Sequence, residues 1–281
     1  MSRHGEQKQR SGAYLERLKP HEQAVAEQRL TWNWTEQAKD LLTRYPRRTT
    51  IHDRVYPTSE AIEQQLIEQW GRTFPTVVEF QRELCGVTFP TAGPDGDWLT
   101  WGLSQGSIDP PRFFEPQEIP GFSCSEFSTA RPDYYVITLD GRLTQGIYIA
   151  QSAQTEIERL AFQMHRRETM EICQWWSISI EQLPLSIHSV FQAVEAVLPE
   201  IGWSVYAPGS DDYHRIYSGG TGYASCRYGF EDQEHLFFRL SAHHPEIAAL
   251  VYASISKLID LPPLKFGESF GAHTFHCGFR R

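Results

Sequence analysis

Residues 57–86 read PTSEAIEQQLIEQWGRTFPTVVEFQRELCG, and this stretch predicts two short helices joined by a tight connection. Ile62, Leu66 and Trp70 repeat every four residues, so the first helix has one apolar stripe. Gly71 follows at the point where a helix end favours a left-handed residue. The stretch therefore predicts a compact helix pair whose first member ends at Gly71.

Both helices also have recognisable starts. Thr58 or Ser59 can cap the first helix, and Pro75 suits the turn before the second. Thr76 and Glu79 form the T-x-x-E pattern of a capping box, which predicts that Thr76 caps the second helix. The apolar face of the second helix consists of Val77, Phe80 and Leu84, and Gly86 supplies its end.

The composition is that of a packed globular protein. The chain has 281 residues, 40% of them hydrophobic and 13% aromatic, which is enough for one large domain or two of ordinary size. The sequence has no apolar run of the roughly 18–20 residues that span a bilayer, and its start lacks the apolar core of a secretory signal. We therefore expect a cytoplasmic protein without a membrane segment.

The charge is unevenly placed. Residues 1–50 hold ten Lys or Arg against six Asp or Glu, a net charge of +4. The whole chain has a net charge of −9, so the remaining residues carry −13. An acidic body repels phosphate backbones, which argues against nucleic-acid binding, and it would suit a basic protein partner. Solubility alone is the simpler interpretation of the same charge.

The five cysteines lie 39 to 53 residues apart and form neither a CxxC pair nor a disulfide framework: Cys85, Cys124, Cys173, Cys226 and Cys277. We interpret them as reduced, mostly buried thiols. His243-His244 and His273-x-x-His276 do not by themselves supply the three or four convergent ligands that zinc needs. We therefore expect neither a metal nor a cofactor.

The order of predicted elements divides the chain into an N-terminal helical segment (residues 1–50), an α+β domain (51–176) and a C-terminal α+β domain (177–281). In the middle part we predict strands at 134–139 and 146–150, joined by an Asp140-Gly141 turn and a longer loop at RLTQ. A helix follows from Ser152 and could extend as far as Trp176. In the last part we predict a helix at 187–198, strands at 203–206, 213–217, 223–230 and 236–240, a helix from Pro245, and a last strand at 273–279.

Two motifs could carry chemistry, and we interpret both as structural. Residues 267–271, GESFG, match the nucleophile elbow of serine hydrolases, but only ten residues follow, without Asp or Glu, so the match is attributed to chance and no catalytic residue is predicted. Asp211-Asp212 with His214 resembles an acid–base group, but it follows a Pro-Gly-Ser turn, which favours a solvated loop.

The helix pair resembles the start of the SUKH superfamily, which contains bacterial immunity proteins and fungal cell-wall regulators. The matching positions are Ile62, Leu66, Gly71, Phe74, Pro75, Phe80, Leu84 and Gly86. The segment GIYIAQSAQTEIERLAFQMHR is similar to the strand and closing helix of that family, so the resemblance covers about residues 55–167. Cys85 stands where the family usually has Asn, and Thr76 where it favours an acid.

The resemblance implies an α+β fold, with a curved, mostly antiparallel sheet and helices on one side, plus a second α+β unit at the C-terminus. It also implies binding rather than catalysis, since many bacterial members neutralise a toxin, often a basic nuclease, by direct contact. Acidic side chains would attract a basic partner, and aromatic side chains are typical anchors of binding hot spots. On that basis we predict a partner-binding surface at Asp95, Asp97, Trp98, Trp101 and Asp109.

Two alternatives remain. The chain could be a scaffold subunit that docks an acidic partner on its basic N-terminal segment, or a hydrolase with its site around His243, Ser269, His273 and Cys277. The sequence does not indicate an oligomeric state.

Overall fold

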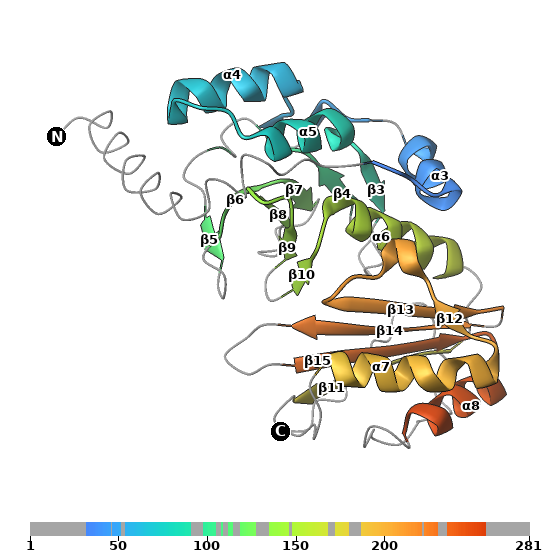
Figure 1. Cartoon of the computed structure of the whole chain (residues 1–281). Helices are drawn as coiled ribbons and strands as arrows, with labels where there is room; N and C mark the ends of the chain where they lie inside the picture. Colours follow the sequence, from blue (N-terminus) through green and yellow to red (C-terminus); the bar gives the residue numbers. More distant parts are fainter. Residues whose placement is uncertain are drawn as a thin grey trace. The chain divides into compact units, whose positions relative to one another are not determined.

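The structure is a computed structural model that describes residues 32–45, 47–51, 54–90, 98–104, 108, 112–114, 119–127, 135–145, 148–167, 172–179, 187–220, 222–229 and 235–256. These residues form two compact units, which are described separately (Figure 1). Unit 1 contains the described residues within 1–33, 39–146 and 152–154, and unit 2 contains those within 34–38, 147–151 and 155–281. None of the helices in these ranges has the length and apolar character that crossing a bilayer requires.

The two predicted helices of the opening stretch are α4 (Ser59–Trp70) and α5 (Pro75–Leu84). Thr58 caps α4, because its hydroxyl oxygen accepts a hydrogen bond from the Ala61 N–H. Gly71 follows in the left-handed conformation, with φ at 70°. Both ends of α4 confirm the sequence prediction.

The start of α5 differs from the prediction. Pro75 is the first helical residue and Phe74 precedes it as the N-cap residue, with no side-chain cap. Thr76 therefore lies inside the first turn, where its hydroxyl donates to the carbonyl oxygen of Leu139 at 3.0 Å. The capping box of Thr76 and Glu79 was a wrong prediction, because proline is itself favourable at the first helical position.

The strands of unit 1 are short and pair antiparallel. They are β1 (Thr50–Ile51), β2 (Arg54–Val55), β3 (Thr88–Pro90), β4 (Trp98–Trp101), β5 (Arg112–Phe114), β6 (Ile119–Ser123), β7 (Ser125–Phe127), β8 (Tyr135–Thr138) and β9 (Leu143–Gln145). The pairings are β1–β2, β3–β4–β7 and β5–β6–β8–β9. The helix pair covers β6, because Trp70 and Phe74 pack against Phe122 with ring centroids 6.4 and 5.8 Å apart.

The turn at Asp140-Gly141 is tighter than predicted. The N–H of Gly141 donates to Thr138, and the N–H of Thr138 donates to Arg142, both at 2.9 Å. β9 therefore starts directly after the turn, at Leu143, within the stretch that we expected to be a loop.

Unit 2 contains an antiparallel sheet with the strand order β11–β15–β14–β13–β12. Its strands are β10 (Tyr148–Ala150), β11 (Ile172–Ser179), β12 (Ser204–Val205), β13 (His214–Gly219), β14 (Gly222–Gly229) and β15 (His235–Ala242). Its helices are α6 (Ala153–Arg167, whose first two residues belong to unit 1), α7 (Ile187–Val197), η3 (Leu198–Ile201), η4 (Ala207–Gly209) and α8 (Pro245–Ile255). β10 pairs with the last residue of β14.

Residues 172–179 are a strand, and the prediction that a helix from Ser152 could reach Trp176 is wrong. α6 ends at Arg167, and all eight residues of β11 pair with β15. The sequence ICQWWSIS is rich in β-branched and aromatic residues, which favour a pleated and half-buried surface.

Helices pack on both faces of the unit 2 sheet. α7 and α8 share a buried cluster with Tyr217, whereas Phe162 of α6 packs against Ile216 and Tyr223. Ile216 and Tyr217 are neighbours in β13, and successive strand residues point to opposite faces. The contact of Phe162 is therefore on the face opposite to α7 and α8.

The α+β class is confirmed. The division of the chain differs from the expected boundary between residues 176 and 177, because most of α6 belongs to unit 2 and covers the second face of its sheet. Of the predicted N-terminal helix, the described residues contain α3 (Glu36–Arg44). The predicted last strand at 273–279 lies outside the described residues.

Candidate functional site

The partner-binding surface predicted from the sequence needs a correction at Trp101. This residue of β4 is fully buried, and its ring packs against those of Phe80 and Tyr135 with centroids 6.2 and 4.6 Å away. Trp101 is thus part of the core of unit 1 and cannot serve as a surface anchor. Asp95, Asp97 and Asp109 lie outside the described residues.

Trp98, at the start of β4, is half-buried. The guanidinium carbon of Arg48 lies 5.0 Å from the centroid of its ring, and the Tyr45 ring meets it edge-on at 6.0 Å. A cation over an aromatic face contributes about 0.5–1 kcal/mol at an exposed site. Trp98 therefore helps to hold in place the basic tract formed by Arg44, Arg47 and Arg48, and its side chain remains partly accessible.

A neighbouring arginine of this tract has a structural role. The Arg47 guanidinium donates to the carbonyl oxygens of Glu83 and Cys85 at 2.7 and 3.3 Å, at the C-terminal end of α5. Cationic side chains are favourable there, because the last carbonyls of a helix carry partial negative charge. Arg47 therefore serves as a C-terminal cap.

The outward face of α4 is acidic and carries one exposed apolar side chain. Glu60, Gln64, Ile67 and Glu68 are exposed, and Ile67 is 44% exposed. α4 contains no Lys or Arg. The pKa of Glu60 lies below its usual value, because its own backbone N–H and then the Ser59 hydroxyl donate hydrogen bonds to the carboxylate. The face is therefore negatively charged at neutral pH.

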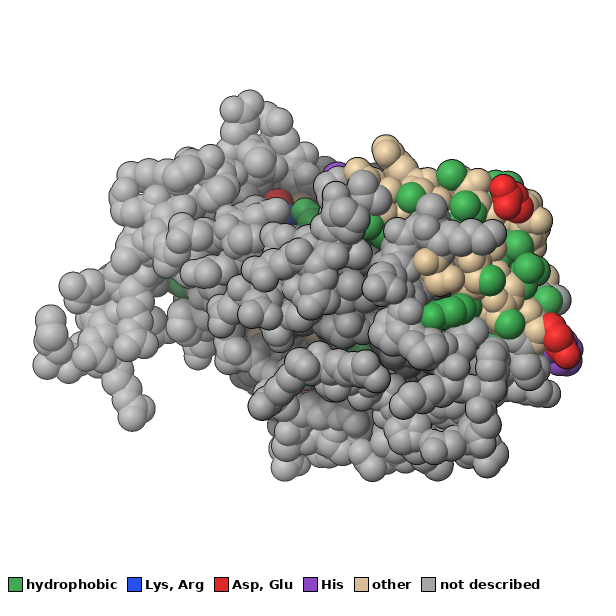
Figure 2. Space-filling view, turned by 90° about the horizontal axis from the view of Figure 1, so that it is seen from below, with side chains coloured by type: hydrophobic (Ala, Val, Ile, Leu, Met, Phe, Trp, Pro, Cys, Tyr) green, Lys and Arg blue, Asp and Glu red, His purple; other side chains and the backbone are tan. Residues whose placement is uncertain are grey.

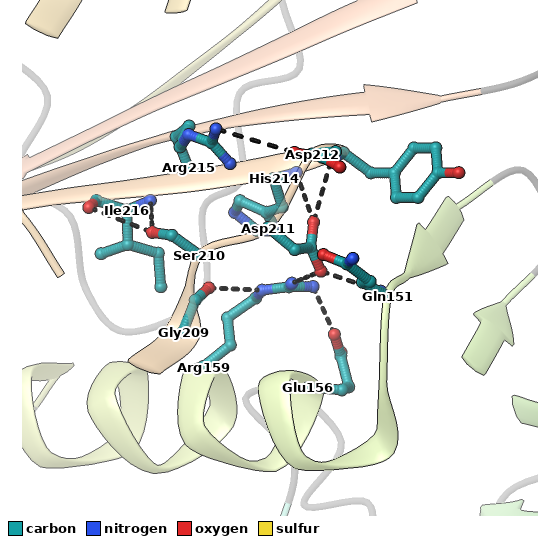
Figure 3. A network of polar contacts seen from close by, with 11 residues as sticks. Gln151, Glu156, Arg159, Gly209, Ser210, Asp211, Asp212, His214, Arg215 and Ile216 are labelled. Atoms are coloured by element: carbon teal, nitrogen blue, oxygen red, sulfur yellow. Dashed lines mark hydrogen bonds and ion pairs between the residues drawn. The ribbon is translucent and has the colours of Figure 1, made fainter. Parts of the chain in front are cut away.

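The main buried polar cluster of unit 2 surrounds Arg159 of α6 (Figure 3). Arg159 is 1% exposed, and Nη1 donates to Glu156, one turn earlier in the same helix. Nη2 lies 3.2 Å from Oδ2 of Asp211, and Nε donates to the carbonyl oxygen of Gly209 at 3.4 Å. One guanidinium thus connects α6 to the segment that leads into β13.

Both carboxylate oxygens of Asp211 accept hydrogen bonds within this cluster (Figure 3). Its Oδ1 accepts the N–H groups of Tyr213 and His214, both at 2.9 Å, and its Oδ2 accepts the N–H of Gln151 at 2.9 Å in addition to Arg159. A carboxylate offers about four lone-pair sites. Asp211 therefore orders the chain and is not available as a general base.

The interpretation of residues 211–214 as a solvated loop is correct for one of its two acids. Asp212 is exposed and lies 4.0 Å from Arg215. Asp211 is 5% exposed, and its cation comes from a helix 52 residues earlier. The sequence signal that could have found it is the Glu156–Arg159 pair on the face of α6 that also carries Phe162.

Three of the cysteines have described side chains, and these are free and mostly buried thiols, as predicted. Cys124 and Cys226 are 0% exposed, Cys85 is half-buried, and none of the three is in a disulfide. Burial raises the pKa of all three thiols, and Arg47 partly offsets this effect at Cys85. These groups are therefore protonated and unreactive at neutral pH.

We expect iodoacetamide at pH 8 to leave Cys124 and Cys226 unmodified in the folded protein and to modify Cys85 slowly, whereas all three react in 8 M urea. Unfolded thiols titrate near pH 8.5, below their pKa in the folded protein, so the stability from these groups is complete below about pH 8.5 and falls at higher pH. Peptide mass spectrometry measures the modification. Rapid native labelling of Cys226 would contradict the assignment.

Within the described ranges, no group of three or more His, Cys, Asp or Glu could hold a metal ion. The rings of His243 and His244 are 6.3 Å apart at the entrance of α8. Ser269, His273, His276 and Cys277 lie outside the described residues. The hydrolase alternative therefore stays a prediction from the sequence.

Comparisons of the chain with protein-family models, with curated proteins and with solved structures found no match. The SUKH resemblance is thus an inference from residues 55–167 of this sequence. In the part of the chain that the structure describes, the buried charges around Arg159 are paired within the fold, whereas the acidic face of α4 is exposed to solvent.

Proposed function

We propose that this chain is a non-enzymatic protein-binding module whose partner is a basic protein, and that its specific role is to neutralise a basic toxin by direct contact. The observation that carries the proposal is the outward face of α4, where Ile67 stands exposed between Glu60 and Glu68. This combination suits a protein partner, because acidic groups attract a basic surface and an apolar side chain can be buried at the centre of a contact.

The charge of the surrounding helix pair supports the same partner. Residues 59–84 contain five Glu and two Arg, and the chain after residue 50 carries −13. Complementary charge raises the association rate of two proteins by steering their encounter, and the effect weakens with salt. We therefore expect the binding of the partner to be fast at low salt.

The SUKH resemblance supports the neutralising role. Its residues form the α4–α5 pair: Ile62, Leu66, Phe74, Phe80 and Leu84 are buried, and Gly71 and Gly86 have positive φ. The residues that carry the resemblance thus shape the helix pair, and the acidic face lies on the other side of α4. An apolar surface also exists in unit 2, where Leu250 of α8 is 49% exposed and hydrophobic side chains gather on the described face (Figure 2). α8 is less acidic than α4, since it contains one Glu, Glu246, against three in α4, so it offers a basic partner less attraction.

The first experiment is co-expression of the chain with the basic proteins encoded beside its gene, with cell growth and co-purification as readouts. Once a partner is in hand, Glu60→Lys with Glu68→Lys is expected to lower its affinity at least tenfold, mainly through the association rate. Surface plasmon resonance at several salt concentrations measures both rates.

The matched control is Glu246→Lys with Glu200→Lys. It makes the same change in charge at exposed sites of unit 2, and Glu246, like Glu60, is in the first turn of its helix. An equal loss of affinity in both double variants would show that the α4 face acts only through the overall negative charge of the protein. If no basic protein co-purifies and none is neutralised, the proposal fails.

A further inference from the structure

β11 is the last strand at one edge of the unit 2 sheet (Figure 1). All eight of its residues, Ile172–Ser179, pair with β15, and among the described strands β11 pairs with no other. In an antiparallel strand, alternate residues direct their N–H and C=O groups to opposite sides, so about half of these groups of β11 point away from β15. The edge is therefore a row of backbone donors and acceptors that is long enough to pair with a further strand.

The opposite edge of the same sheet has features that prevent such pairing. β12 has only two residues, Ser204–Val205, and Pro208 follows it in η4. Short edge strands and proline are common means by which proteins block the pairing of an edge with another chain. β11 has neither, since its eight residues are in continuous register with β15 and include no Pro. One edge of the sheet is thus blocked, and the other is able to pair.

β11 also contains no charged residue. The next three strands of the sheet each contain one arginine: Arg239 in β15, Arg227 in β14 and Arg215 in β13. Charged residues usually mark edge strands, where they discourage pairing, so the distribution here is the reverse of the usual one. An uncharged edge suits a second copy of this chain. The net charge is −9, so two copies repel each other, and they approach most easily along a strand without charge.

We propose that β11 pairs antiparallel with β11 of a second copy of this chain, so that the unit 2 sheets of a homodimer form one continuous sheet. A two-fold axis perpendicular to the sheet produces this pairing, because it reverses the strand direction and brings the same edge of both copies together. The free donors of each copy then meet the free acceptors of the other. Assembly ends at two copies, because the β12 edge is blocked. The dimer goes beyond the proposed function, which concerns α4 of unit 1, and does not depend on it.

The first test uses the unmodified full chain. Sedimentation velocity over a range of protein concentrations is expected to show a reversible equilibrium between monomer and dimer. Hydrogen–deuterium exchange, read by mass spectrometry, is expected to slow in β11 as the dimer forms, because the amides at its free edge become hydrogen-bonded. The amides of β12, at the other edge, are expected to keep their rate.

The second test is Ser177→Lys in β11. Pairing would partly desolvate the new charge and bring it near the same charge of the other copy, so the dimer affinity is expected to fall at least tenfold. The matched control is Ser204→Lys, which makes the same substitution at an exposed position of β12 and is expected to leave the equilibrium unchanged. Far-ultraviolet circular dichroism checks that both variants fold, and Ser179→Lys, at the end of β11, replaces Ser177→Lys if that variant does not.

Three results would overturn the proposal. The first is a chain that stays monomeric at every concentration. The second is a dimer that forms without slower exchange in β11, because its contact would then lie elsewhere. The third is an equal loss of dimer affinity in Ser204→Lys and in the β11 variant, because the effect would then not depend on the edge that carries the charge.

Discussion

Replacement of Arg159 by Met is expected to destabilise the protein by about 3–5 kcal/mol, which is the typical cost of removing one partner from a buried ion pair. Met fills much of the same space but leaves Glu156 and Asp211 buried without their shared cation. Urea unfolding followed by far-ultraviolet circular dichroism measures the effect. Hydrogen exchange in β13 identifies whether the loss occurs at the segment that Asp211 orders.

Two comparisons separate the charge network from simple loss of packing. Arg166→Met makes the same substitution on the same helix at a half-buried position, where the guanidinium lies 5.7 Å from the Phe162 ring, and we expect a loss of about 1 kcal/mol or less. Adding Glu156→Met to Arg159→Met is expected to restore part of the stability, because it removes one of the two uncompensated charges. A single variant Arg159→Met that is as stable as Arg166→Met would show that the network contributes nothing.

The sequence predicted those features of the fold that local patterns encode. Thr58 and Gly71 mark the ends of α4 because capping uses residues adjacent to the helix. Thr76 shows the limit of this reasoning, since its hydroxyl donates a hydrogen bond to a carbonyl oxygen 63 residues later in the chain. A capping pattern indicates that a side chain is able to cap, and tertiary contacts decide whether it does so.

The candidate sites depended on contacts that the sequence does not show. Trp101 was predicted as a surface anchor because it stands near Pro- and Gly-rich segments with several Asp, yet Phe80 and Tyr135, from distant parts of the chain, enclose its ring. Asp211 was predicted as a loop acid because it follows a Pro-Gly-Ser turn, and the sequence did not show that Arg159, on a helix assigned to the other domain, would be its cation. The three glutamates of α4 are visible in the sequence, but no binding surface was predicted from them.

Replacement of Gly86 by Ala is expected to destabilise the protein by about 3 kcal/mol. Gly86 has φ at +75°, which costs a non-glycine residue about 1–2 kcal/mol, and the new Cβ would lie 2.3 Å from the backbone oxygen of Arg48. Overpacking of this kind adds about 1–3 kcal/mol. The neighbouring segment cannot move away without cost, because the Arg48 N–H donates to the carbonyl of Gly86, and the Gly86 N–H donates to that of Trp101, both at 2.7 Å.

Gly71→Ala provides the control for this prediction, because Gly71 has nearly the same conformation in an open setting. Its φ is +70°, and a Cβ there would meet no atom within 4 Å, so only the conformational cost of about 1–2 kcal/mol applies. The difference between the two variants in the free energy of urea unfolding therefore gives the cost of the steric contact between a Cβ at residue 86 and the backbone of Arg48. Equal losses would mean that this approach relaxes freely, and that Gly86 is needed only for the end of α5, as the sequence alone predicted.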